Sequence, residues 1–468
     1  MKQNKLWKVL GIAFLALVVL SWIIPAATYA TGAFKLGVIS PIGFFDLIRL
    51  PLATISNYVT YGIFLLVLGG LYGVMNATGV YATLLNSLVT AFKKKETMFL
   101  IVTTVGFALF SAITGLTFVL FILVPLFVSA LLLMNYNKIT ALAATVGAIL
   151  VGGFSSIYGY KVSVFINYLF NIGANQYVLV KIALLIVSVV LLVIFMLNAN
   201  KKAKAEKLTD IPLYDKTEEK KKSMVPLIAL LSLTVILLLV GLYNWTYGAS
   251  TTFFETLYTN MTSFKIAGFP IIKNLMGVIN PLGWWGIEEI TMILILLSIV
   301  LGWVYNLKIK ETIKSFIKGA QEMAVPAFYV VLANILMAFI ANGQSDSNLY
   351  NTIAHFFLTM SGGFNIVTTA IVALFGGLFY NDVSYVLNTM SSNIMKVVTD
   401  TTMYPVIGLI FQTVHGLLML VLPTSLMLIA GLSYLKVSYL DWIKYIWLYV
   451  LQLLAVAAVV IVVMSLLV

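Results

Sequence analysis

The sequence contains no cysteine, only two histidines and a single arginine, Arg49. Without cysteine the chain has no disulfide scaffold, no thiolate metal site and no cysteine nucleophile. Two histidines are too few for a histidine-rich metal site. A single arginine also leaves little scope for bidentate arginine clamps on anions. The chemistry of this chain therefore depends on hydroxyls, amides, backbone groups and a small number of charges.

Charge of either sign is scarce. Only 9% of the residues are charged and 62% are hydrophobic, whereas a soluble domain carries about 25% charged residues. Segments 176–198, 225–245 and 446–468 are almost wholly apolar, and each is long enough for a helix to cross about 30 Å of hydrocarbon. The composition therefore predicts an integral membrane protein.

The formal net charge of +12 does not indicate a nucleic-acid partner, because the lysines lie in short loops between apolar segments. This distribution is typical of the cytoplasmic face of a membrane protein. We expect residues 7–28 to form an uncleaved first helix with a cytoplasmic N-terminus. The predicted location is the cytoplasmic (inner) membrane, with the lipid bilayer as the main partner and no nucleic acid.

Sequence motifs for ATP-driven or hydrolytic chemistry are absent. The chain has no GxxxxGK[ST] motif, no GxSxG and no HExxH, so neither an ATP-driven pump nor a membrane hydrolase is supported. We therefore predict a protein that is not an enzyme and has no cofactor, apart from Na⁺ or H⁺ as a coupling ion.

A short internal repeat is the most informative feature. Residues 101–110 read IVTTVGFALF and residues 366–375 read IVTTAIVALF. Each segment opens a long apolar stretch that small and hydroxyl residues interrupt. Broken hydrophobic segments in the two halves of a chain indicate a secondary transporter, whose binding site forms from unwound backbone near the membrane midplane.

The distribution of lysines and apolar segments predicts an all-α polytopic membrane protein with about nine transmembrane helices plus two re-entrant helical hairpins in two inverted repeats. The first repeat half is 1–198, with a hairpin at 97–134 and a broken helix at 139–158. A lysine-rich cytoplasmic linker, 199–223, separates it from the second half, 224–468, with a hairpin at 366–398 and a broken helix at 402–434. Either hairpin could instead form full spans.

Four interruptions of the apolar segments carry the candidate site. Glycine, proline, hydroxyl and amide residues gather at 111–117, 152–156, 380–393 and 422–425. Broken helices release N–H groups that can hold a carboxylate, and carbonyls that can hold Na⁺; close helix packing is the alternative. The predicted substrate-binding residues are Ser111, Thr114, Gly115, Ser155, Ser156, Asn381, Thr424 and Ser425.

Two ionisable residues are candidates for binding a coupling ion or proton. Asp382 is the one carboxylate that the predicted topology places at depth, and a buried acid in a membrane indicates function; a shallow, hydrated hairpin tip is the alternative. His415 precedes Pro423 in the last broken helix and could relay protons or pack as a neutral, hydrogen-bonded residue.

Several short motifs resemble a known family. They are 22–25 (WIIP), 68–79 (LGGLYGVMNATG), 423–425 (PTS) and 437–442 (VSYLDW). In these the chain is similar to the YfcC-like, C4-dicarboxylate anaerobic carrier family of the ion transporter superfamily. The resemblance implies two inverted repeats, each with a hairpin and a broken helix, and it implies a homodimer.

The chain departs from the pattern of that family at its polar positions. Thr114 to Thr117 stand where related carriers have acidic residues, and His415-Gly416 stands where they have a Gly-Asp pair. The second hairpin has either 381–384 (NDVS) or 391–393 (SSN) in place of a Ser-Gly-Ser pattern. We expect a divergent member whose fold follows the family and whose substrate is open.

The predicted function is secondary active transport of a small carboxylate-bearing, C4-dicarboxylate-like metabolite, coupled to an ion gradient or to exchange, by elevator-like alternating access. One alternative is an amino-acid antiporter of the arginine/ornithine type, with Asp382 facing the substrate ammonium group. A channel or a non-transporting membrane scaffold is an alternative of another class. A channel would show polar periodicity along several helices, whereas here the polar residues gather at breaks.

Overall fold

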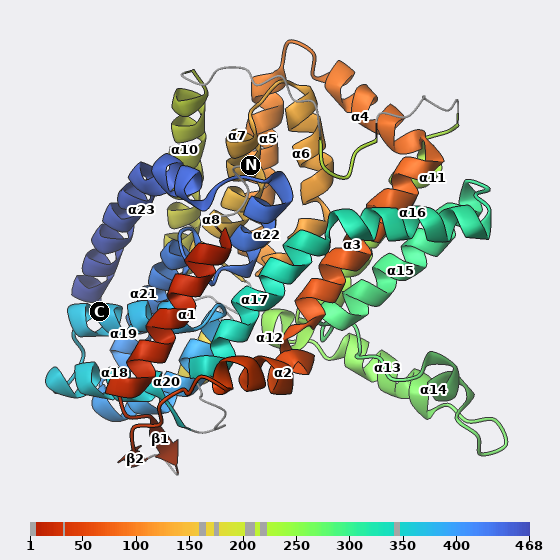
Figure 1. Ribbon diagram of the computed structural model, residues 1–468. Coiled ribbons are helices and arrows are strands. Elements are labelled where there is room, and N and C mark those ends of the chain that lie inside the picture. The colour runs from red at the N-terminus through yellow and green to blue at the C-terminus, as the bar shows by residue number, and fades with distance from the viewer. Residues whose placement is uncertain are drawn as a thin grey trace. The chain divides into compact units, whose positions relative to one another are not determined.

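The computed structural model describes residues 6–30, 33–158, 165–172, 177–201, 211–215, 222–340 and 347–468 (Figure 1). The chain packs into two compact units. The first comprises Met1–Gly62, Lys94–Thr209 and Val325–Val468, and the second comprises Ile63–Lys93 and Asp210–Ala324. Each unit therefore combines segments from both predicted repeat halves, so the packing units and the sequence repeats divide the chain differently.

The first unit contains both predicted hairpins and both predicted broken helices. Its elements are α1 (Leu6–Ile23), β1 (Ala27–Ala30), β2 (Ala33–Leu36), α2 (Asp46–Tyr58), α5 (Glu96–Thr114), η1 (Phe118–Ile122), α6 (Val124–Leu133), α7 (Lys138–Leu142), η2 (Ala143–Gly147), α8 (Ala148–Phe154), α9 (Phe165–Phe170), α10 (Val178–Lys201), α17 (Ala324–Ile340), β3 (Ser347–Asn348), α18 (Leu349–Met360), α19 (Ile366–Phe379), α20 (Val383–Val397), η4 (Thr401–Met403), α21 (Tyr404–Met419), α22 (Leu426–Leu435) and α23 (Tyr439–Leu467).

The second unit is formed by fewer helices. Its elements are α3 (Thr60–Thr78), α4 (Val80–Ala91), α11 (Val225–Leu242), α12 (Trp245–Ala249), α13 (Phe253–Ser263), α14 (Ile271–Met276), α15 (Ile287–Val304) and α16 (Ile309–Glu322).

The prediction of an all-α polytopic membrane protein is confirmed. Within the described ranges, 8 helices are long and apolar enough to cross a membrane, or up to 9 if α16 and α17 count as one broken span. The predicted broken helix at 139–158 contains α7, the π-helical turn η2 and α8, which follow one another directly over Lys138–Phe154. A π-helical turn often marks a functional position in a helix.

A small sheet was not predicted. Strand β1 pairs antiparallel with both β2 and β3, in the order β2-β1-β3. The longest of these strands has four residues, too few to show an alternating pattern between long apolar segments. The sheet joins the chain after α1 to the start of α18.

The two copies of the repeated segment occupy equivalent places in the first unit. The first lies in α5 and the second begins α19, and each of these helices packs most extensively against a later helix of its own half, α5 against α8 and α19 against α21. Figure 1 shows α5 and α6 at one end of this unit and α19 and α20 at the other, with α8, α21 and α22 between them.

In the second unit, helices α3 and α16 cross with their backbones almost in contact. A Cβ atom added to Gly319 would lie 2.0 Å from the Gly69 carbonyl oxygen, and one added to Gly73 would lie 2.1 Å from that of Ser315. Glycines four residues apart allow this approach. No larger side chain fits at this crossing without moving a helix.

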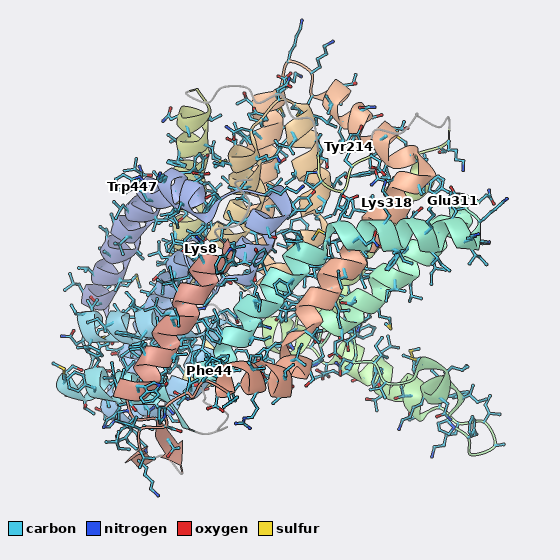
Figure 2. All side chains as sticks on the ribbon, in the orientation of Figure 1. Lys8, Phe44, Tyr214, Glu311, Lys318 and Trp447 are labelled. Atoms are coloured by element: carbon cyan, nitrogen blue, oxygen red, sulfur yellow. The ribbon has the colours of Figure 1, made fainter. Side chains whose placement is uncertain are left out.

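Part of the predicted linker 199–223 docks on that pair of helices, while residues 202–210 and 216–221 lie outside the described residues. Leu213 is 1% exposed; its carbonyl accepts from Asn76 Nδ2 at 2.9 Å, and its N–H donates to Glu322 Oε2 at 2.9 Å. Lys318 pairs with Asp215 at 2.5 Å. Figure 2 labels Tyr214 in this segment and Lys318 on α16. Residues 211–215 are thus held in place, not solvated as the composition of the linker suggested.

Candidate functional site

The first hairpin turns at Gly115, directly after α5. Gly115 has φ 68°, a left-handed conformation that glycine adopts at little cost. The Thr114 hydroxyl donates to the Phe110 carbonyl at 2.5 Å and accepts from the N–H of Leu116. Thr114 and Gly115, both predicted to bind substrate, therefore end the helix and shape the turn. Ser111, one turn earlier, is buried, and its Oγ has no hydrogen-bond partner among the described residues.

The end of α8 lies against the end of α5. A Cβ on Gly152 would be 2.3 Å from the Ala108 carbonyl oxygen and 2.6 Å from Ser111 Cβ. Beyond the helix end, the N–H of Ile157 donates to the Ala112 carbonyl at 2.8 Å. The first hairpin and the break after α8 therefore form one packed assembly.

The two serines at the break after α8 differ in their bonding. Both are fully buried. Ser155 Oγ donates to the Val151 carbonyl at 2.9 Å, whereas Ser156 Oγ has no hydrogen-bond partner in the described structure. Of this predicted pair, Ser156 is the one with unused hydrogen-bonding capacity.

Gln412, on α21, connects the break after α8 to the second half of the chain. Its Nε2 donates to the carbonyls of Phe154 at 3.2 Å and Ser156 at 3.0 Å. Four residues on, Gly416 allows close contact, since a Cβ there would lie 2.4 Å from Phe154 Cα. Our sequence-based site omitted Gln412, although an amide beside Thr413 and His415 in an apolar helix was a usable signal.

His415 faces the second hairpin. A Cβ on Gly377 of α19 would lie 3.6 Å from the His415 ring, and the backbone of Tyr380 hydrogen-bonds to that ring. The carboxylate of Asp382 lies within electrostatic reach. The structure therefore places Asp382 and His415, the two predicted ionisable residues, in one region.

The second hairpin turn is held by its own polar side chains. Asn381 Nδ2 donates to Asn334 Oδ1 at 2.9 Å, and Asn334 Nδ2 donates to the Tyr58 carbonyl at 3.3 Å. Asp382 Oδ1 accepts from the N–H of Ser384 at 2.9 Å and from its hydroxyl at 2.7 Å. Asp382 is thus the N-cap of α20, a role that carboxylates fill well.

The last break lies between α21 and α22. Thr424 and Ser425 are both buried there, and Ser425 begins α22 without a side-chain capping bond. Trp442 Nε1 donates to the Leu420 carbonyl at 2.8 Å, which satisfies one of the carbonyls that the end of α21 releases. Thr424 Oγ1 has no hydrogen-bond partner in the part of the chain that the structure describes.

Five buried polar atoms at these breaks and on α21 have no hydrogen-bond partner among the described residues. They are Ser111 Oγ, Ser156 Oγ, Gln412 Oε1, His415 Nε2 and Thr424 Oγ1. Leaving such an atom unpaired costs about 1–3 kcal/mol, so an unpaired atom indicates water, an ion or a ligand. Similar atoms occur elsewhere in the described chain, including Asn393 Nδ2 in the interruption at 380–393, but these five lie on α21 or at the three interruptions around it.

A buried lysine borders the same region. Lys181, in the first turn of α10, is 6% exposed and lines a small cavity with Tyr177, Gly408 and Gln412. The sequence did not indicate a role for Lys181, because one lysine near the start of a long apolar segment resembles an interfacial residue.

These observations describe a polar region inside a membrane domain, built from helix breaks. The family model for DcuC, C4-dicarboxylate anaerobic carrier, matches residues 5–466. The chain belongs to this family. As a DcuC family member it is a multi-pass membrane carrier and a secondary transporter, and it is not an enzyme. The narrower YfcC-like assignment stays a prediction.

Comparison with solved structures finds the YdaH transporter of Alcanivorax borkumensis, whose crystal structure is described as revealing an unusual topology. The two chains share 14% sequence identity, and the match covers 98% of this DcuC family member and 97% of that chain, with a TM-score of 0.42. No curated protein matches the sequence significantly.

Proposed function

We propose that this carrier moves a small C4-dicarboxylate-like anion across the cytoplasmic membrane, by ion coupling or by exchange, with the substrate held at the helix breaks of the first unit. Membership of a family described as C4-dicarboxylate anaerobic carriers supports the substrate class. The single observation that carries the site is the group of five buried polar atoms without partners.

The chemistry of these atoms suits a carboxylate. The hydroxyls of Ser111, Ser156 and Thr424 can each donate a hydrogen bond, and His415 Nε2 can donate when it carries a proton. Hydrogen bonds to a charged group contribute about 1.5–3 kcal/mol each. Gly115 would act by setting the turn, Thr114 and Ser155 would hold the surrounding backbone, and Asn381 would fix the second turn through Asn334. Ser425 would act as the first residue of α22.

Coupling of transport to Na⁺ or H⁺ would use other atoms than those that bind the carboxylate. Gln412 Oε1 accepts hydrogen bonds or binds cations but cannot donate, so it is a candidate Na⁺ ligand together with carbonyls released at the breaks. His415 beside Asp382 is a candidate pair for carrying a proton. Within the described residues no group of three or more His, Asp or Glu side chains could hold a metal ion.

Alternating access would follow from the inverted repeats. The hairpins occupy opposite ends of the first unit (Figure 1), and exchange of the conformations of two repeats opens a site to one side of the membrane and then to the other. We propose an elevator-like motion, a cytoplasmic N-terminus and a homodimer on the basis of the lysine distribution and the family resemblance.

The test is transport by purified protein in proteoliposomes. Dicarboxylates, keto acids and amino acids are applied with and without a Na⁺ or H⁺ gradient, while charge movement and radiolabel counterflow are measured. Counterflow of a C4 dicarboxylate supports the proposal. Counterflow of arginine or ornithine alone would replace it with the antiporter. Absence of counterflow for every solute would contradict the proposed substrate class.

The two adjacent serines provide a matched pair for the site. Ser156→Ala removes an unpartnered hydroxyl, so the apparent KM for the transported anion should rise about tenfold or more. Ser155→Ala removes a hydroxyl that already bonds to the Val151 carbonyl, and its KM should change by less than about threefold. Equal effects of the two substitutions would remove Ser156 from the substrate site.

A further inference from the structure

Lys181 is an unusual residue for its position. Among the described residues it is the only Lys, Arg, Asp or Glu that is buried, and it lies in α10, whose segment Val178–Ala199 is long and apolar enough to span the membrane. A charged side chain inside a membrane protein is costly and normally serves binding or transport.

Lys181 lines a cavity together with a residue of the proposed site, Gln412. Lys181 lines a cavity with Gln412, Gly408 and Leu409 of α21, and Tyr177 and Pro405 complete much of its wall. The cavity offers about 10 Å³ of free volume, which is close to the space of one water molecule. Gln412 in turn donates to the Ser156 carbonyl, so the cavity that Lys181 lines and the break after α8 share one residue.

Snorkelling does not account for this placement. A snorkelling lysine packs its stem on apolar surface and keeps its ammonium group in water. Lys181 is 6% exposed as a whole residue and borders a small cavity shared with Gln412, whose Oε1 has no hydrogen-bond partner among the described residues. Protein, and not water, therefore covers most of the Lys181 side chain.

We propose that Lys181 is the residue that selects substrates by charge: its ammonium group favours a dianion at the adjacent helix breaks over a monoanion or a cation. This proposal rests on the proposed function. A cation in a medium of low dielectric acts strongly on neighbouring charges, and repulsion of the wrong substrate contributes to specificity as much as attraction of the right one. Lys181 contributes through the field at the site and through the water that its cavity can hold.

The experiment compares succinate, a dianion, with its half-amide succinamate, a monoanion of similar shape. Both compete with radiolabelled succinate for counterflow in proteoliposomes. For Lys181→Gln we expect the preference for the dianion over the monoanion to fall about tenfold or more, since one charge–charge interaction is lost. Lys181→Arg should keep the preference. Lys444→Gln, which changes an exposed lysine on α23, is the matched control and should match the wild type.

The outcomes separate this inference from the proposed function. If the wild type shows counterflow of no C4 dicarboxylate, the proposed function fails; if it transports another C4 dicarboxylate, that dianion and its half-amide replace succinate and succinamate. If the wild type transports succinate and Lys181→Gln keeps the same dianion preference, only the role of Lys181 is overturned. Should Lys181→Gln not fold, as judged by its melting temperature in detergent, Lys181→Met gives the same test, because replacing a buried charge by an apolar group of similar length is often neutral.

Discussion

The two hairpin turns of the first unit use their polar residues in opposite ways. At the first, Thr114 and Gly115 complete the turn, and Ser111 has a buried hydroxyl without a partner. At the second, Asn381 is bonded to Asn334 and Asp382 to Ser384. The first turn therefore has unused hydrogen-bonding capacity, and the second is saturated from within the chain.

This difference shows that similar sequences in a repeat need not have similar roles. A saturated turn is already organised and can position His415 without a ligand. A turn with an unpaired hydroxyl is stabilised only when water, an ion or a substrate forms the missing hydrogen bond. We infer that the first hairpin binds the substrate directly, while the second holds the ionisable residues Asp382 and His415 in a fixed place.

The largest effect on transport is expected when the unpartnered hydroxyl of Ser111, at the first turn, is removed. Ser111→Ala should raise the apparent KM for the transported anion by about tenfold or more, because a hydrogen bond to a charged group contributes about 1.5–3 kcal/mol. Its melting temperature should hardly change, since no bond within the protein is lost. Ser384→Ala, at the saturated turn, should show the reverse: a lower melting temperature and a nearly unchanged KM. Transport kinetics and thermal unfolding in detergent measure both.

The next effect concerns the backbone of the first turn. Gly115→Ala should destabilise the protein by about 1–2 kcal/mol, because a side chain is strained in the left-handed conformation. Gly106→Ala is the control on the same helix: Gly106 is interior to α5, and a Cβ there meets nothing within 4 Å, so this change should stabilise by up to about 1 kcal/mol. Opposite shifts in melting temperature are expected; shifts of the same sign would contradict a specific requirement at Gly115.

A smaller effect is expected at the start of α20. Asp382→Ala should destabilise by about 1 kcal/mol through loss of the N-cap, and Asp382→Ser, which can still cap, should restore most of that stability. If Asp382 also carries protons, both variants should lose H⁺-driven uptake while counterflow persists. Retention of H⁺-driven uptake by both variants would limit Asp382 to capping.

The smallest effect on stability is expected from the hydrogen bond between Asn381 and Asn334. A double-mutant cycle with Asn381→Ala and Asn334→Ala should give a coupling free energy of about 0.5–1.5 kcal/mol, the usual contribution of one hydrogen bond. Thermal unfolding of the two single variants and the double variant provides it. Strict additivity would show that this bond does not help to hold the second turn.

The sequence was sufficient to predict the class of fold and the family. Long apolar segments and scarce charge lead directly to a polytopic helical protein, because the bilayer fixes the length of a spanning helix. Helix breaks at Gly115 and Pro423 could be found because glycine and proline act locally. The family could be predicted from motifs such as 423–425, because these match the family in residue identity and not only in hydropathy.

Other features could not be predicted, because they depend on contacts between distant segments. Gln412 bonds to carbonyls more than 250 residues away in the sequence, and no local pattern encodes that contact. The docking of Leu213 depends likewise on Asn76 and Glu322, whereas local composition suggested a solvated linker. Tertiary packing also decides which hydroxyls have no hydrogen-bond partner. Ser155 and Ser156 were therefore indistinguishable in the sequence.

The crossing of α3 and α16 has a mechanical consequence. Where backbone touches backbone at Gly69, Gly73 and Gly319, no side chain can change rotamer to absorb a displacement, so the contact is stiff. The chain passes between its two units directly before Ile63 of α3 and directly after Ala324, two residues beyond the end of α16. Two of the covalent connections between the units thus start from one stiff pair of helices. If the carrier bends at these two connections, the residues next to them have to change conformation, because the α3–α16 pair is too stiff to do so.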